Sequence, residues 1–445
     1  MKINMTKKFN IILTSVILVL ALVITIITGI TFKSFSDYQT YFYVREDKVE
    51  VQHLSKYIPS IEGTVGDTEI YVLKGDEVTA DTDITKCPSI LILGGTHPNE
   101  PSGQLTATLL LENIKVSGNT VVFIITETNK SAYTHSHPQE ATSFYYGLNT
   151  QSGKERLFKF GSRATNTNQQ WPNPDVYTHI DPNTGAIQQL STNDTRNLNR
   201  AYPGNKNGTY TEKIAYGIVE LIKQNDIKVT IDLHEASPEY QTINTIIHHP
   251  KAGSVASNAK TTYLDKVDGL DDFTITIEKA PGNLRGLTHI ELGDYTNTLS
   301  FLCETSNASQ GKIRGAFTED LITYYKKDKF YEAAAELDIK RLENGEQPLL
   351  YARPVSIDER VARHLASIEA IIHAYNYEAG RKKTGFLSLG EERKQFLHEC
   401  GKFQIDFGLA DMLSGDDKTQ YGNDETCYQM VYNLGVGYFL HDPKE

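Results

Sequence analysis

The chain has 445 residues, of which 39% are hydrophobic and 10% aromatic, and its formal net charge is −12. A chain of this size has room for one large domain with an extension, or for two domains. The acidic balance, together with the lack of a Lys/Arg cluster interleaved with aromatic residues, argues against a nucleic-acid partner. The four cysteines form no C-x-x-C pair, so we expect no cysteine zinc site.

The segment from Phe9 to Phe32 contains no charged residue and is dominated by Ile, Leu and Val. About 20 such residues span the core of a bilayer. Three lysines precede the segment, which predicts that residues 1–8 stay in the cytoplasm and that the rest lies outside. A cleaved signal peptide is the rival interpretation, although its apolar core would be shorter. We expect a single-pass anchor over 9–32 in the cell membrane, a linker over 33–48 and an extracellular remainder of the chain.

A strand, a turn and a helix are predicted around one pair of polar residues. The run from Ile90 to Leu93 is apolar and partly β-branched, which is typical of a short buried strand. Two glycines permit a sharp turn, and His97 and Glu100 follow it. Pro101 then opens an apolar-periodic run that indicates a helix with proline in its first turn. Ligands in open α/β sheets gather at such carboxyl ends of strands.

The spacing His-x-x-Glu is a weak signal when it is taken alone. It occurs twice, as His97/Glu100 and as His137/Glu140, which is about what chance gives in this composition. The first pair follows a predicted strand, whereas the second lies in a polar stretch. We therefore predict a metal site at the first pair and a solvated loop at the second. The alternative for the first pair is a polar turn between strand and helix.

Further apolar runs continue the pattern of alternating strands and helices. Thr120–Thr126, Ile227–Leu233 and Thr298–Cys303 are typical of buried strands, and Thr211–Gln224 has helical periodicity. A strand, a helix and a second strand in succession predict parallel pairing. We expect an α/β fold with a mixed sheet flanked by helices.

Two regions differ from this pattern. Residues from about Asn129 to Asn197 are polar and include the single tryptophan, Trp171, so we interpret them as a surface insertion beside the site. From about Thr318 onward the periodicity is mostly helical, including Arg360 to Tyr375. The predicted boundaries are 49–317 for the domain that carries the candidate site and 318–445 for a helical extension.

Two other predicted strands also end in a polar group. His234 follows the strand Ile227–Leu233, and Glu304 follows Thr298–Cys303. Two imidazoles and one carboxylate, here His97, His234 and Glu100, form a set typical of catalytic zinc with a fourth position for water. A separate carboxylate is then needed as general base, and we predict that Glu304 takes this role.

Each of these residues could instead have an ordinary structural role. His234 could be a satisfied core histidine, and Glu304 could be an ion-paired loop residue. Glu235 should point to the opposite side of its strand from His234. The neighbours His248 and His249 would also face opposite ways in an extended chain, which disfavours them as a ligand pair.

The stretch from Arg196 to Gly204 is the last candidate. Asn199 and Arg200 present an amide and a guanidinium side by side, followed by a Pro-Gly turn. Arginine binds a planar carboxylate through two parallel hydrogen bonds, which lysine cannot match. The alternative is an ordinary surface turn.

The order of these motifs resembles the succinylglutamate desuccinylase/aspartoacylase family of the wider zinc carboxypeptidase superfamily. The resemblance covers roughly residues 88–315, about half the chain. It implies that one zinc ion is held by His97, Glu100 and His234, and that Asn199 and Arg200 grip a substrate carboxylate. It also implies that Glu304 is the catalytic carboxylate. An arginine polarises the scissile carbonyl in this superfamily. Arg163 and Arg196 compete for that role; Arg163 is favoured, and Arg196 is then grouped with Asn199 and Arg200 as substrate-binding.

The chain also departs from the family pattern. Members of the aspartoacylase type are often soluble intracellular enzymes with a β-rich carboxyl-terminal domain. This chain instead predicts an anchor, a long insertion and a helical extension. We expect a membrane-anchored zinc hydrolase that cleaves an amide bond beside a free carboxylate, as a carboxypeptidase or an N-acyl-amino-acid deacylase. The alternative is an extracellular binding module that keeps the zinc pocket without turnover.

Overall fold

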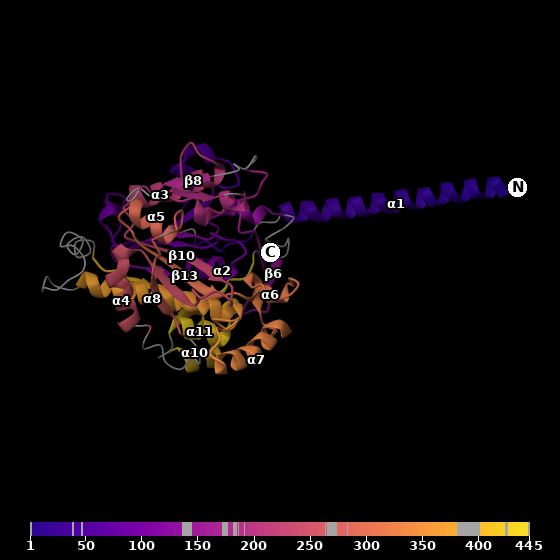
Figure 1. Ribbon diagram of the computed structural model, residues 1–445. Helices are drawn as coiled ribbons and strands as arrows, with labels where there is room; N and C mark the ends of the chain where they lie inside the picture. The colour runs from indigo at the N-terminus through magenta and orange to yellow at the C-terminus, as the bar shows by residue number, and fades with distance from the viewer. Residues whose placement is uncertain are drawn as a thin grey trace.

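A computed structural model of the chain describes residues 2–37, 40–45, 48–135, 145–170, 177–180, 185, 187–190, 192–262, 264, 274–282, 284–380, 401–422 and 426–443. Within these ranges the centre of the molecule is an eight-stranded mixed sheet (Figure 1). Its strands, in spatial order, are β1 (Val49–His53), β2 (Glu69–Lys74), β5 (Val121–Ile125), β3 (Ser89–Leu93), β10 (Val229–Ala236), β13 (Leu299–Ser306), β11 (Thr245–His248) and β12 (Thr276–Lys279).

The four central strands β5, β3, β10 and β13 run parallel, as the strand–helix–strand pattern predicts. The flanking strand β2 is antiparallel to β5, and β11 is antiparallel to β13. The expected mixed sheet flanked by helices is therefore confirmed. Three two-stranded sheets accompany it, formed by β4 (Lys115–Val116) with β14 (Ile405–Asp406), β6 (Tyr145–Asn149) with β7 (Glu155–Lys159), and β8 (Tyr177–Ile180) with β9 (Ile187–Leu190).

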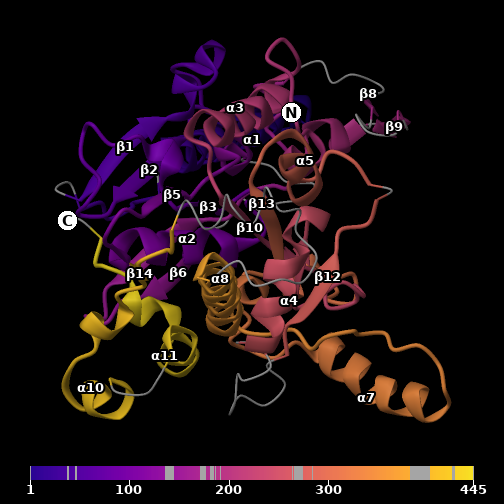
Figure 2. The same ribbon diagram turned by 90° about the vertical axis from the view of Figure 1, so that its left-hand side faces the viewer.

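Helices cover both faces of the main sheet. Figure 2 shows α3 (Tyr210–Asn225) and α5 (Thr288–Tyr295) on one side and α2 (Pro101–Asn113), α4 (Gly253–Thr262) and α8 (Ile357–Gly380) on the other. Apart from α1 and short 3-10 turns, the other helices of the described chain are α6 (Asp320–Thr323), α7 (Lys329–Glu343), α10 (Gly415–Tyr421) and α11 (Cys427–Leu434). Residues of α8 and α11 share one buried apolar cluster with the sheet, so the helical carboxyl-terminal part packs directly against it.

Strands β10 and β13 continue beyond their predicted ends. They pair in register as far as Ala236 with Ser306, and His234 lies opposite Glu304. Directly paired residues present their side chains on the same face of a sheet. His234 and Glu304 therefore share a face within the strands, rather than following them in loops. The polar side chains interrupt the apolar run, while the backbone pairing goes on.

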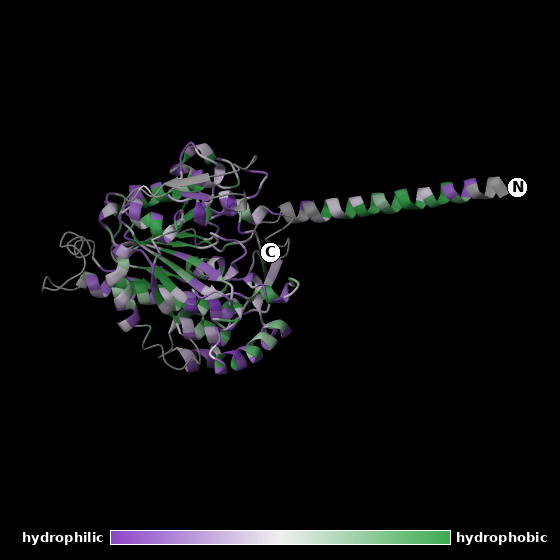
Figure 3. Cartoon of the chain, in the orientation of Figure 1, coloured by the Kyte–Doolittle hydropathy of each residue, from purple (hydrophilic) through white to green (hydrophobic). Residues whose placement is uncertain are grey.

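The amino-terminal helix α1 (Lys2–Asp37) contains an apolar stretch from Lys7 to Thr31 that is long enough to cross a membrane. Figure 3 shows it as a mostly hydrophobic helix that projects from the rest of the chain. Its apolar side chains are exposed, which distinguishes it from a core helix of the folded body. A signal sequence would pass the same test of length and composition, so the anchor stays a prediction.

Residues 40–45, expected within a linker, lie against the folded body. The backbone amide of Tyr43 donates to Glu112 of α2, and Arg156 of β7 forms an ion pair with Glu112 at 2.6 Å. The same guanidinium donates to the carbonyls of Tyr41 and His441. The segment after α1 and the carboxyl-terminal residues are thus joined at one buried charge pair.

Candidate metal centre

The turn after β3 explains how His97 and Glu100 come together. Gly95 has a φ of +69°, and a Cβ there would lie 2.5 Å from the hydroxyl of Tyr133, so only glycine fits without displacing its neighbours. Pro101 occupies the start of α2, where its missing N–H costs nothing. Glu100 is the residue before the helix, yet its side chain makes no capping bond and turns towards His97 instead.

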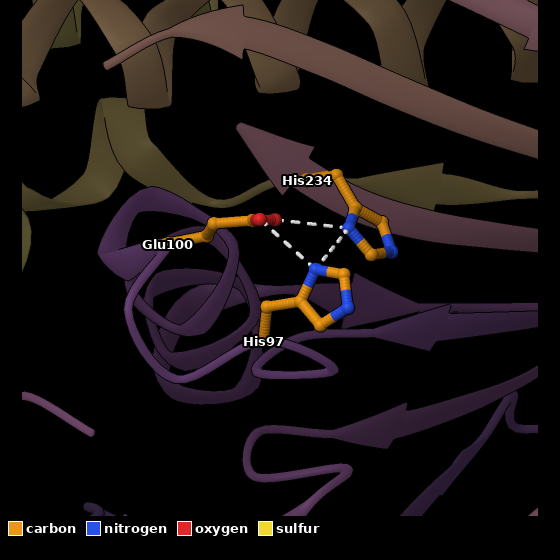
Figure 4. A group of neighbouring side chains, drawn as sticks. All are labelled: His97, Glu100 and His234. Atoms are coloured by element: carbon orange, nitrogen blue, oxygen red, sulfur yellow. Dashed lines mark hydrogen bonds and ion pairs between the residues drawn. The ribbon is translucent and has the colours of Figure 1, made fainter. Parts of the chain in front are cut away.

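His97, Glu100 and His234 form one buried cluster (Figure 4). Nδ1 of His97 lies 2.9 Å from Oε1 of Glu100, and Nδ1 of His234 lies 2.9 Å from Oε2. The two Nδ1 atoms are 3.1 Å apart. All three residues are about 1% exposed. The residues that the sequence predicted as metal ligands are therefore in contact, and the group they form could hold a metal.

The outer nitrogens of both imidazoles fix their tautomers. Nε2 of His97 lies 2.8 Å from Oδ1 of Asn197, an oxygen that also accepts from the backbone amide of Asn199. Nε2 of His234 lies 2.7 Å from Oδ2 of Asp232. Because both partners are acceptors, each Nε2 carries the hydrogen, and each Nδ1 points a lone pair inwards.

When both imidazoles are neutral, their two lone pairs and the Glu100 carboxylate converge on the centre of the cluster, and a cation there would satisfy them. Burial disfavours the charged form of His234, but Asp232 and Glu100 outweigh it and hold the pKa of this imidazole well above its ordinary value. Burial and the charge of Arg163 lower the pKa of His97 to about 4. Two nitrogens and a carboxylate match the ligand set that zinc prefers, so these residues fit a zinc ion.

Glu304 lies on β13 directly opposite His234. Its Oε2 atom is buried and accepts no hydrogen bond from the residues that the structure describes. Burial, against the opposing charges of His234 and Arg163, raises the pKa of the Glu304 carboxyl to about 8. A cation at the neighbouring cluster would favour its ionised form. A carboxyl group with a free acceptor atom and a pKa near neutrality is suited to moving protons.

The two candidate arginines occupy different positions. Nη1 of Arg163 lies 2.9 Å from Oε1 of Glu100, and its side chain is 39% exposed. Arg196 is buried, and its Nη1 donates to the carbonyl oxygen of Thr165 at 2.6 Å. Arg163 therefore contacts the cluster from a position that is open to solvent, whereas Arg196 bonds to the backbone of a neighbouring loop.

Asn199 and Arg200 lie in a short 3-10 turn, Leu198–Arg200. Because the backbone amide of Thr288 donates to Oδ1 of Asn199 at 2.9 Å, the group that this side chain can offer to a ligand is its Nδ2. Nη1 of Arg200 donates to the carbonyl of Asn199. Burial and the charge of Arg163 lower the pKa of Arg200, so an anion beside these two arginines would be stabilised.

The less favoured candidates do not join the cluster within the described residues. His248 bonds to the carbonyl of His249, and His249 pairs with Asp294. Glu235 lies on the other face of the sheet from His234 and pairs with Arg360, as the strand period predicts. His137, Glu140 and Trp171 lie outside the residues that the structure describes.

Sequence reasoning missed the residues that hold the ligands in place. Asp232 accepts from the hydroxyls of Thr96 and Thr288 as well as from His234. Its position two residues before His234 places both side chains on one face of β10, a signal that was available in the sequence. Asn197, 100 residues from His97, left no comparable signal.

No family profile matches this sequence, and no curated protein matches it. Among the solved structures to which the chain is similar is a succinylglutamate desuccinylase/aspartoacylase from Rhodobacter sphaeroides, at 17% identity and a TM-score of 0.32, covering 64% of each chain. Another is a succinylglutamate desuccinylase from Silicibacter sp. TM1040, at 13% identity and a TM-score of 0.30, covering 57% of each chain. A third is the tripeptide-bound cell shape determinant protein Csd4 from Helicobacter pylori, at 14% identity and a TM-score of 0.38, covering 74% of this chain and 59% of that one.

This chain therefore matches less than two thirds of the length of each of those proteins. Their names are consistent with the family resemblance that the motifs carry. The sheet topology and the buried cluster of this chain carry the functional argument.

Proposed function

We propose that this protein is a membrane-anchored, zinc-dependent hydrolase that cleaves an amide bond beside a free carboxylate, as a carboxypeptidase or an N-acyl-amino-acid deacylase. The observation that carries the proposal is the convergence of His97, Glu100 and His234 in one buried cluster. On the neighbouring strand lies Glu304, whose Oε2 accepts no hydrogen bond from the described residues. Two imidazoles and a carboxylate buried within 4.8 Å of one another match the ligand set of a catalytic zinc ion.

The roles of the residues follow from their contacts. Zinc, when bound, would supply a Lewis acid and a water molecule of lowered pKa. Glu304 would take the proton of the attacking water and return it to the leaving amine, for which its free Oε2 is suited. Arg163 would donate to the oxygen of the scissile carbonyl, where negative charge develops.

The substrate carboxylate would bind to Asn199 and Arg200. The Nδ2 of Asn199 is available to donate, and the guanidinium of Arg200 adds a charged donor. Arg196 would support this substrate site indirectly, because its hydrogen bond to the carbonyl of Thr165 fixes the loop that precedes Asn199 and Arg200. The exposed apolar helix α1, with lysines before its apolar stretch, supports the membrane anchor and an external site.

A hydrolysis panel with the full-length protein in detergent tests the proposal. N-acyl amino acids and short peptides are supplied as free acids and as matched carboxyl-terminal amides. We expect zinc-dependent release of the amino acid from free acids, abolished by a chelator and restored by added zinc. Binding of these compounds without any turnover would instead favour the non-catalytic binding module.

A further inference from the structure

The helical carboxyl-terminal part has no role in the chemistry described so far, yet one of its residues reaches the strand that carries His234. Arg360 of α8 has a fully buried side chain, and its Nη1 lies 2.7 Å from Oε1 of Glu235. The carboxyl group of Glu235 is also fully buried. These two residues are 125 apart in the sequence. A buried ion pair is costly to form unless its geometry is good, so we asked what this pair holds in place.

The other end of Glu235 contacts the candidate metal ligands. Its backbone amide donates to Oε2 of Glu100 at 3.0 Å, the same oxygen that faces Nδ1 of His234. Strand β3 pairs with β10 only as far as Asp232, so the amide of Glu235 lies beyond the last residue of β3 that could pair with it. The Glu100 carboxylate thus satisfies an amide that would otherwise lack a partner, and the amide in turn fixes the rotation of that carboxylate.

The side chain of Glu235 is what holds this amide in place. Its carboxylate accepts from Arg360 and from Nδ2 of Asn307 at 3.0 Å. Arg360 also donates to the carbonyl of Ile322, so its guanidinium is held from two sides. Of these donors Arg360 alone is charged. Without Arg360, the buried Glu235 carboxylate would have only neutral partners. We expect the end of β10 to shift so that this charge becomes better solvated.

We propose that Arg360 is a positioning residue for the metal centre: through the Glu235 carboxylate it holds the amide that orients Glu100 towards the two imidazoles. This inference rests on the proposed function, since it needs a metal at that cluster. The helical carboxyl-terminal part would thereby set the affinity and geometry of the metal site from the opposite face of the sheet. Partners of metal ligands typically contribute about 10- to 100-fold in metal affinity.

The chain offers a matched control on the same helix. Arg363 is 2% exposed and forms a buried ion pair with Glu359 at 2.7 Å, but it donates to Thr274 rather than to β10. Arg363→Met therefore removes a buried arginine and its ion pair without touching the link to Glu100. Arg360→Lys keeps the charge but loses the fork that reaches both Glu235 and Ile322.

The test measures zinc dissociation constants of the full-length protein in detergent by competition with a chromophoric chelator, together with the visible spectrum of the cobalt-substituted protein. We expect Arg360→Met to weaken zinc binding by about 10-fold or more and to alter the cobalt spectrum. Arg360→Lys should fall between Arg360→Met and the parent, and Arg363→Met should match the parent in both readouts while lowering the unfolding temperature.

If Arg360→Met does not fold, weakened zinc binding by Arg360→Lys still supports the inference. Parent-like zinc binding by either folded Arg360 variant overturns it, and so does an equal loss in Arg363→Met. A parent protein that binds no zinc at all overturns the proposed function instead, so the two failures are distinguishable.

Discussion

Nε2 of His234 lies 2.7 Å from Oδ2 of Asp232, and both side chains are buried on the same face of β10. The carboxylate fixes the tautomer of the imidazole, so that the lone pair of Nδ1 is directed at Glu100 and His97. Two hydroxyls, from Thr96 and Thr288, hold the carboxylate in turn. The orientation of this imidazole is therefore set by residues outside the cluster of His97, Glu100 and His234.

The first prediction concerns this pair. Asp232→Asn should weaken zinc binding by about 10- to 100-fold, because an amide can donate to Nε2 and so favour the wrong tautomer. Chelator competition measures the change. Asp294→Asn is the matched control, since Asp294 also pairs with a histidine, His249, but away from the cluster. Equal zinc affinities for Asp232→Asn and the parent would contradict the orienting role.

The second prediction separates the base from the ligands. Glu304→Gln keeps the shape of the side chain but removes the proton acceptor, so turnover should fall by about 100-fold or more. Zinc content and unfolding temperature should stay close to those of the parent, because Glu304 is not a member of the cluster. Glu291→Gln, a buried carboxyl paired with Arg285, controls for the loss of a buried charge. Full activity in Glu304→Gln would show that another group moves the proton.

The third prediction concerns recognition of the substrate carboxylate. Arg200→Lys retains a positive charge but loses the bidentate fork. We expect kcat/KM to fall by about 10-fold or more for free-acid substrates and to change little for their amides, because only the former use the fork. The ratio of the two values is the measurement. A parallel decline for acids and amides would point to a structural role for Arg200.

The fourth prediction concerns topology. With α1 in the membrane and the lysines before its apolar stretch in the cytoplasm, protease added to intact cells should digest the large domain. Lysis of the cells before digestion gives the control in which every part is accessible. Complete protection in intact cells, or a mature amino terminus after Phe32, would defeat the anchor.

Local pattern was enough to predict the elements that carry the site. The apolar runs that became β3, β5, β10 and β13 were recognisable because buried parallel strands are hydrophobic on both faces. The helix that starts at Pro101 was marked by its proline and its periodicity. His97, Glu100 and His234 were predicted from their place at the carboxyl ends of these strands, and they lie in one cluster.

The supporting contacts could not be predicted, because they join residues far apart in the sequence. Asn197 meets His97 across 100 residues, and Arg360 meets Glu235 across 125. Neither contact has a period or a motif, since each depends on how a loop or a helix packs on the completed sheet. The docking of residues 40–45 on Glu112 and Arg156 likewise follows from tertiary packing, whereas the sequence there has the polarity of a linker.

The position of the metal tests the central claim most directly. A crystal structure of the zinc-loaded protein, with anomalous data collected on both sides of the zinc absorption edge, locates the ion without assumption. We predict one zinc, about 2.0–2.2 Å from Nδ1 of His97, from Nδ1 of His234 and from the Glu100 carboxylate, with Glu304 close by but not bound to it. A zinc ion held by other residues, such as His137 or His248, or an empty cluster in zinc-saturated crystals, would contradict the account.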